Sequence, residues 1–373
     1  MATNTQKLFE LGQSIWYDNI ERRVLKNGEL AAMIERGDIY GVTSNPSIFN
    51  KAVGESKDYD EDIAVLAEQG RNVDAIYEAL TFDDIRAATD LFSPLYGSTR
   101  GGDGFVSIEV HPDLAGDTQG SLDQARHFWT RLERPNLMVK IPGTQAGLEA
   151  IRASIAEGIN INITLIFSRQ RYAEVIDAYF SGLEQRVEEG KAIDSISSVA
   201  SFFVSRIDGK VDGWLEEIVQ SGGEKGRLAA SLQGKVAIAN AKLAYQLFKE
   251  QCAGARFKAL EAKGAQVQRP LWASTSTKNP AYPDVQYVDE LIGAQTVNTV
   301  PPETLQGFLD HGSPELSIER DLEGAHQVMA DLETLGLSLD QATDELEAEG
   351  VDAFSKSIHQ LLDTIRDRRR ILI

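Results

Sequence analysis

The sequence has little cysteine: Cys252 is the only one in 373 residues. A single thiol excludes an intrachain disulfide and a metal centre built from cysteines. Such sparse cysteine is typical of proteins in a reducing compartment, so we expect a cytoplasmic protein. Packing in the interior is the role most typical of one such thiol.

Basic residues and long apolar runs are also in short supply. The chain has 37 lysines and arginines against 57 aspartates and glutamates, a formal net charge of −20. This charge repels nucleic acid and anionic membranes, so an anionic ligand needs a local cluster of donors. No apolar run approaches the ~20 residues that span a bilayer, and no export signal is evident. We therefore expect neither a nucleic acid nor a membrane as partner.

Several signatures of catalysis are missing as well. No Gly-x-Gly-x-x-Gly follows an expected strand and no P-loop is present, which argues against nucleotide binding. The five histidines show no zinc-site spacing. No Gly-x-Ser-x-Gly elbow indicates a serine hydrolase. Dinucleotide, metal-dependent and serine-hydrolase chemistry therefore find little support.

What the chain does contain is an alternation of short β-like runs with helical patterns, which predicts parallel strands joined by helices. Because eight parallel strands close a barrel, we predict an α/β fold with a single (β/α)8 TIM-type barrel. The eight runs lie near residues 13–18, 39–45, 104–110, 136–142, 159–167, 195–204, 268–274 and 294–300.

We predict one domain over residues 1–373, with its strands within about 13–300. Helical spacing over about 50–103 predicts extra helices between the second and third strands. A helical extension is expected at about 302–373, on the outside of the barrel or across its mouth. Its apolar stripe consists of Phe354, Ile358, Leu361, Leu362 and Ile365.

The expected strands are polar on one face. Every second residue from Ile159 to Leu165 is apolar, and Asn162 and Thr164 lie on the opposite face. Glu109 is placed in the same way in the run near 104–110. Because helices follow these strands, the apolar faces should meet the helices and the polar faces should look into the barrel. We therefore predict a polar barrel mouth that binds a ligand.

Asp18 and Asn45 lie at the C-terminal ends of the first two expected strands. Barrel enzymes place their chemistry at these ends. Aspartate and asparagine there are also ordinary turn residues and helix caps. The recurrence of such residues on successive strands favours a site.

Lys140 ends a strand-like run in which its neighbours are apolar. Desolvation there would lower the pKa of the lysine and supply free amine for a Schiff base with a carbonyl carbon. The alternative is a structural lysine paired with a carboxylate. A salt bridge to Glu109 in particular would raise the pKa of Lys140 and oppose catalysis.

A mouth shared by these residues would suit aldol chemistry on a ketose. Lys140 would form the imine, and Asp18 would take the hydroxyl proton released when the neighbouring carbon–carbon bond breaks. Glu109 with Thr164 would hold the water of imine formation and release.

The remaining candidates would bind the rest of a sugar phosphate. Asn45 and Asn162 can donate to and accept from sugar hydroxyls. Hydroxyl and cationic donors for a phosphate follow the sixth and seventh runs, namely Ser201, Arg206, Ser274 and Lys278. For the two cations, solvated surface positions are the alternative.

Three segments together resemble the transaldolase family. Residues 42–47 are similar to its strand-two signature, 139–142 to its Schiff-base lysine segment and 158–167 to its strand-five motif. The resemblance spans nearly the whole barrel. It implies transfer of a dihydroxyacetone unit from sedoheptulose 7-phosphate to glyceraldehyde 3-phosphate, in the pentose phosphate pathway. Erythrose 4-phosphate and fructose 6-phosphate would be the products, with phosphorylated sugars as partners and no metal or organic cofactor.

The resemblance also implies a role for each candidate residue. Carried over position by position, it gives the Schiff base to Lys140, acid/base roles to Asp18 and Glu109, the water to Thr164, sugar hydroxyls to Asn45 and Asn162, and phosphate to Arg206 and Ser274. Many transaldolases carry an arginine after strand seven where this chain has Lys278, which we expect to act as a point charge instead. The chain is longer than the compact members of the family and in this respect resembles a long-chain bacterial type.

Two other functions stay open at this point. A Schiff-base aldolase of the same fold would release free dihydroxyacetone from fructose 6-phosphate. A non-catalytic sugar-phosphate-binding barrel would bind without turnover, although such a module has no need of a desolvated lysine beside two carboxylates. The sequence leaves the oligomeric state open between a monomer and a homo-oligomer.

Overall fold

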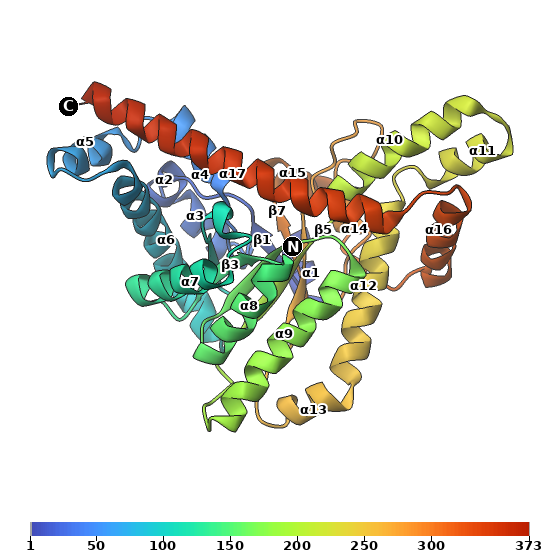
Figure 1. The fold of residues 1–373 in the computed structure, drawn as a ribbon, viewed down its shortest axis with the longest axis horizontal. Coiled ribbons are helices and arrows are strands. Elements are labelled where there is room, and N and C mark those ends of the chain that lie inside the picture. Colours follow the sequence, from blue (N-terminus) through green and yellow to red (C-terminus); the bar gives the residue numbers. More distant parts are fainter. Residues whose placement is uncertain (1, 373) are drawn as a thin grey trace.

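The protein, described over residues 2–372 by a computed structural model, contains a parallel β-sheet surrounded by helices (Figure 1). Within those residues the sheet has seven strands in the order β1-β7-β6-β5-β4-β3-β2. The strands are β1 (Gln13–Tyr17), β2 (Val106–Glu109), β3 (Leu137–Pro142), β4 (Ile161–Ile166), β5 (Ser198–Phe203), β6 (Arg269–Ala273) and β7 (Thr296–Val300).

The two edge strands are joined through the segment 39–45, which closes the ring. Val42 forms one parallel bridge to Tyr17 of β1 and another to Val106 of β2. This confirms the TIM-type fold but corrects the prediction of eight strands, because the second one is a single bridging residue. Gly41 sits so close to Trp16 that an added Cβ would lie 2.7 Å from the indole ring. Asn45 already caps the next helix, which leaves a short extended stretch.

Helices cover the outside of the barrel, and those predicted between the second and third strands are α4, α5 and α6. None of the described helices is both long and apolar enough to cross a bilayer. The helices are α1 (Asn4–Glu10), α2 (Arg22–Lys26), α3 (Glu29–Glu35), α4 (Pro46–Glu55), α5 (Asp60–Glu68), α6 (Val73–Ser98), the 3-10 turn η1 (Pro112–Leu114), α7 (Thr118–Leu132), α8 (Gln145–Glu157), α9 (Arg169–Glu188), α10 (Ser205–Ser221), α11 (Gly223–Leu232), α12 (Val236–Ala253), α13 (Ala255–Glu261), α14 (Gln286–Asp289), α15 (Pro302–His311), α16 (Leu322–Thr334) and α17 (Leu339–Leu372).

The core has two layers, as the alternation in the strands predicts. Between strands and helices, Phe202 packs edge-on against Trp272 and against Tyr172 of α9. The N-terminal end of the barrel is filled by a polar cluster around Asp103, which accepts hydrogen bonds from Trp16 Nε1 at 2.8 Å and Arg269 Nη1 at 3.2 Å. A cavity is therefore left for the opposite end of the barrel.

Helix α17 lies across that opposite end, which is one of the two placements expected for the C-terminal extension (Figure 1). Its stripe Phe354, Ile358, Leu361 and Ile365 is buried. Gly350 contacts Leu165 of β4 so closely that an added Cβ would lie 2.8 Å from Leu165 Cδ2. Ion pairs also hold α17 to the helices below it. Lys210 of α10 pairs with Glu345 at 2.6 Å, and Asp60 of α5 pairs with Arg368 at 2.8 Å.

Strand β4 departs from the predicted alternation at Leu165. The register shifts between Ile163 and Ile166, and Leu165 has a φ of +59°. A non-glycine residue in that region costs roughly 1–3 kcal/mol. The Leu165 side chain meets α17 instead of a surrounding helix layer. The prediction was wrong here because a period of two cannot indicate a bulge.

Candidate active site

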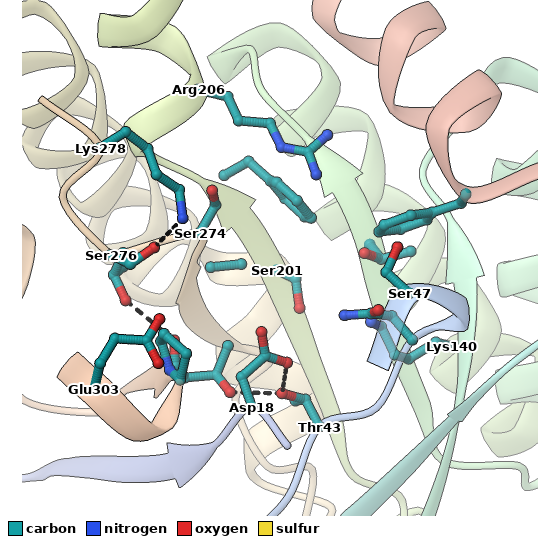
Figure 2. A pocket seen from close by; sticks show the side chains of 18 residues that line it. Asp18, Thr43, Ser47, Lys140, Ser201, Arg206, Ser274, Ser276, Lys278 and Glu303 are labelled. Atoms are coloured by element: carbon teal, nitrogen blue, oxygen red, sulfur yellow. Dashed lines mark hydrogen bonds between the residues drawn. The ribbon is translucent and has the colours of Figure 1, made fainter. Parts of the chain in front are cut away.

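The C-terminal ends of the strands surround a cavity of about 210 Å³ beneath α17 (Figure 2). Most of the predicted site residues line it: Asp18, Asn45, Lys140, Thr164, Ser201, Arg206, Ser274 and Lys278. Glu109 and Asn162 lie behind this lining, where they contact residues that form it.

Lys140 does not have the apolar surroundings that its own strand predicts. Its side chain is 6% exposed, and Nζ lies 3.1 Å from Glu109 Oε2 and donates to the Ser44 carbonyl at 3.1 Å. The register explains the difference, because Glu109 of β2 and Asn162 of β4 pair directly with Lys140 on either side. Side chains in such register point to the same face. The ion pair left open by the sequence is therefore present.

Glu109 is an unusual partner for this lysine. Burial raises the pKa of its carboxyl group, while Lys140 lowers it and Asp18 raises it. Within residues 2–372 neither carboxyl oxygen has an aligned hydrogen-bond partner, although the distance to Lys140 is that of an ion pair. A carboxylate held in this way can accept a proton more readily than one in water.

Asp18 faces the same cavity from the end of β1. Burial raises the pKa of its carboxyl group, which Lys140 and the hydrogen bond from Thr43 lower. Thr43 Oγ1 donates to Asp18 Oδ1 at 2.6 Å and lies 2.6 Å from Thr299 Oγ1. Thr299 must then donate to Thr43, since one hydroxyl carries one proton. This chain of hydroxyls fixes the orientation of Asp18.

The two predicted site residues on β4, Asn162 and Thr164, differ in whether their side chains have hydrogen-bond partners. Asn162 is fully buried, donates to Ser107 Oγ at 3.0 Å and accepts from Ser201 Oγ at 2.7 Å. Thr164 Oγ1 is buried, lines the cavity, and has no partner within the described chain. An orphaned buried hydroxyl there is available to a bound molecule or water.

Asn45 satisfies both of its alternative interpretations. Its Oδ1 accepts from Ile48 N at 3.0 Å, which makes it the N-cap of α4. It also lines the cavity. Its Nδ2 makes no hydrogen bond within residues 2–372 and is free to donate to a ligand.

A cationic end of the cavity is formed by Arg206, which follows β5. Its guanidinium lies 5.3 Å from the ring centroid of Phe203 and 5.9 Å from that of Phe354 on α17. Burial lowers the pKa of Arg206, and the guanidinium has no ion pair or hydrogen bond among the described residues. Cation–π contacts hold the charge without neutralising it. The site therefore keeps an unneutralised cation ready for an anion.

Lys278 lies on the same end of the cavity, beyond β6. Its Nζ donates to Ser276 Oγ at 2.6 Å (Figure 2). Ser274 adopts a φ of +54°, and its Oγ is 3.1 Å from Ser205 Oγ. Backbone strain of this kind clusters at ligand sites.

Sequence reasoning missed several residues of the lining. Thr43 could have been found by continuing the alternation back from Asn45. The polar face of the run near 294–300 consists of Thr296 and Asn298, so the same rule would have missed Thr299. Phe354 belongs to the predicted apolar stripe, but nothing in the stripe indicated that α17 would bring it to Arg206. Glu303, in the first turn of α15, gave no signal beyond its place after the last strand.

Comparisons with known proteins find relatives over nearly the whole chain. A profile of the family described as Transaldolase/Fructose-6-phosphate aldolase matches residues 15–365. The chain is 47% identical to a transaldolase of Trichodesmium erythraeum, over 99% of this chain and 98% of the relative. It is 46% identical to a transaldolase 2 of a Nostoc species, over 97% of each chain. Identity to a transaldolase of Acidothermus cellulolyticus is 48%, over 97% of this chain and 95% of the relative.

Proposed function

The chain belongs to the transaldolase/fructose-6-phosphate aldolase family, and we propose that it transfers a dihydroxyacetone unit from sedoheptulose 7-phosphate to glyceraldehyde 3-phosphate. It is a transferase, and its products are erythrose 4-phosphate and fructose 6-phosphate. The observation that carries this proposal is Lys140 Nζ in a cavity with Asp18 and within 3.1 Å of Glu109.

The ion pair between Lys140 and Glu109 supports nucleophilic catalysis rather than opposing it. A buried pair pays a desolvation cost for both charges, and transfer of one proton from Nζ to Glu109 removes both charges together. Burial, which raises the pKa of Glu109, favours that transfer. The result is a neutral amine in the site and a carboxylic acid beside it.

The covalent step then follows from the positions of these groups. The neutral amine of Lys140 adds to the ketose carbonyl, and loss of water gives a protonated imine. Glu109 supplies the proton with which the departing oxygen leaves as water. The hydroxyl of Thr164, which has no partner among the described residues, holds that water molecule by a hydrogen bond. The reverse of the same steps releases the product ketose.

Cleavage of the carbon–carbon bond requires a base within reach of the hydroxyl next to that bond. Asp18 takes the proton of the hydroxyl next to the breaking bond, and the electron pair of that bond moves into the imine to give an enamine. The aldehyde leaves, an acceptor aldehyde enters, and the enamine attacks it as Asp18 returns the proton. Atoms and electrons balance without any further reactant.

The remaining residues bind the sugar phosphate. Arg206, Lys278 and Ser274 supply charged and hydroxyl donors at one end of the cavity, away from Lys140 (Figure 2). Asn45 contacts a hydroxyl of the dihydroxyacetone unit from the lining. Asn162 lies behind the lining, where it is held by the 2.7 Å hydrogen bond from Ser201, and it contacts a second hydroxyl when the substrate is bound. Such a site fits phosphorylated sugars, and we place the activity in the pentose phosphate pathway of the cytoplasm. We further propose that barrel and extension act as one catalytic domain.

The test is to trap the intermediate and identify the product in parallel. Incubation with fructose 6-phosphate and borohydride should reduce the imine and add a three-carbon unit to Lys140, mapped by mass spectrometry. Lys140→Met should show neither adduct nor turnover. With erythrose 4-phosphate as acceptor, the wild-type protein should form sedoheptulose 7-phosphate.

Each outcome discriminates between the candidates. Active protein without an adduct would overturn the Schiff-base mechanism. Rapid release of free dihydroxyacetone without an acceptor would instead favour a fructose 6-phosphate aldolase. Binding without an adduct or turnover would favour the non-catalytic barrel.

A further inference from the structure

Glu303 is an acidic residue where the proposed function would not call for one. It lies in the first turn of α15, directly after β7 and Pro302, and it lines the cavity. The residue is exposed to solvent at the cavity mouth, and within residues 2–372 its carboxylate makes no ion pair or hydrogen bond with another side chain or with the backbone. An unpaired negative charge there works against the binding of a phosphorylated sugar.

Helix stability explains only part of this placement. An acidic side chain in the first turn of a helix is favoured by the macrodipole. That benefit does not depend on facing the cavity. It also carries an electrostatic cost, because Glu303 is one of the charges that raise the pKa of Asp18. A hydrogen bond to the substrate would explain why the Glu303 carboxylate faces the cavity.

The order of the side chains along the cavity indicates which part of the substrate Glu303 contacts. Figure 2 shows Asp18 and Glu303 toward the same end of the cavity, with other side chains between them, and Ser276 and then Lys278 farther from that end. On the proposed function fructose 6-phosphate presents the same order: the hydroxyl at the breaking bond, a further hydroxyl, and the phosphate. Sedoheptulose 7-phosphate has one more hydroxyl before its phosphate. A carboxylate accepts strong, charge-assisted hydrogen bonds from hydroxyl groups.

We propose that Glu303 accepts a hydrogen bond from the hydroxyl on C2 of the aldehyde, the carbon next to the one that forms the new bond. Glu303 thereby selects aldehydes that carry this hydroxyl. The inference rests on the proposed function. Glu303 is then a specificity-determining residue for the acceptor and for the leaving aldehyde. Its charge also repels a phosphate that enters in the reverse direction, toward Lys140.

The experiment follows the logic of a double-mutant cycle, in which the Glu303 carboxylate and the substrate hydroxyl are removed separately and together. Sedoheptulose 7-phosphate is kept saturating, and kcat/KM is measured for glyceraldehyde 3-phosphate and for its 2-deoxy analogue, 3-phosphooxypropanal. Release of erythrose 4-phosphate is followed in both cases. The proteins are wild type, Glu303→Ala, Glu303→Gln and the control Asp310→Ala, which changes an exposed acid at the other end of α15.

The wild-type protein should prefer the hydroxylated acceptor by about 10- to 100-fold, the effect of one hydrogen bond to a charged group. Glu303→Ala should reduce this preference to within about 3-fold by lowering kcat/KM for glyceraldehyde 3-phosphate alone. Glu303→Gln should keep part of it, because its amide oxygen still accepts a hydrogen bond. Asp310→Ala should leave the preference unchanged.

Two results would overturn the inference. One is an equal loss of kcat/KM for both acceptors in Glu303→Ala, which would mean that Glu303 acts through Asp18 or α15. The other is a wild-type protein without a preference between the acceptors. A wild-type protein that releases no erythrose 4-phosphate with either acceptor would instead refute the proposed function.

Discussion

Replacing Phe354 by leucine tests whether α17 contributes to the phosphate end of the cavity. The ring centroid of Phe354 lies 5.9 Å from the Arg206 guanidinium, and the side chain is only 4% exposed. Leucine keeps most of the packing but removes the aromatic face. A cation–π contact at the outer limit of about 6 Å is worth roughly 0.5–1 kcal/mol. That energy corresponds to about a 2- to 5-fold change in an equilibrium constant.

The assay compares a phosphorylated donor with an unphosphorylated one. Phe354→Leu should raise KM for fructose 6-phosphate by about 2- to 5-fold, as estimated from the lost contact. The rate at which borohydride traps fructose on Lys140 should stay the same, because fructose has no phosphate for Arg206 to bind. Ile358→Val, one turn farther along α17 and fully buried, is the matched control and should change neither value.

The reasoning would be refuted if both donors were affected equally, because Phe354 would then shape the mouth without acting on Arg206. An unchanged KM in a variant with a lowered melting temperature would refute it too. In that case Phe354 would only pack α17 onto the barrel.

Two further predictions concern the stability of the barrel. Gly41→Ala should lower the free energy of unfolding by about 1–3 kcal/mol, as overpacking does, because its Cβ would lie 2.7 Å from the Trp16 ring; a denaturant titration that shows no loss would mean that Trp16 can move aside. Burial raises the pKa of Asp208 in α10 from 3.8 to about 7. Between these values the folded protein keeps a proton that the unfolded chain has lost, so stability should fall as pH rises, by up to ~1.4 kcal/mol per pH unit. Asp208→Asn should flatten this dependence in unfolding titrations at several pH values, and an unchanged slope would assign it to another group.

The sequence by itself determined the architecture and eight of the eighteen residues that line the cavity. The alternation of strand and helix patterns predicted the barrel, and a period of two placed Asn162 and Thr164 on the inner face. Strand ends predicted Asp18 and Asn45. These inferences succeeded because they depend on local geometry, in which neighbouring positions along one strand decide which side a residue takes.

The tertiary structure decided everything that depends on contacts between distant segments. The register of β2 against β3 brings Glu109 to Lys140. The contact with α17 accompanies the bulge at Leu165, and the same helix brings Phe354 to Arg206. Pairing across strands and docking of a helix arise from the packing of the whole chain, and no local pattern encodes them. The polar contacts of the lysine that the sequence identified are therefore made with residues on other segments.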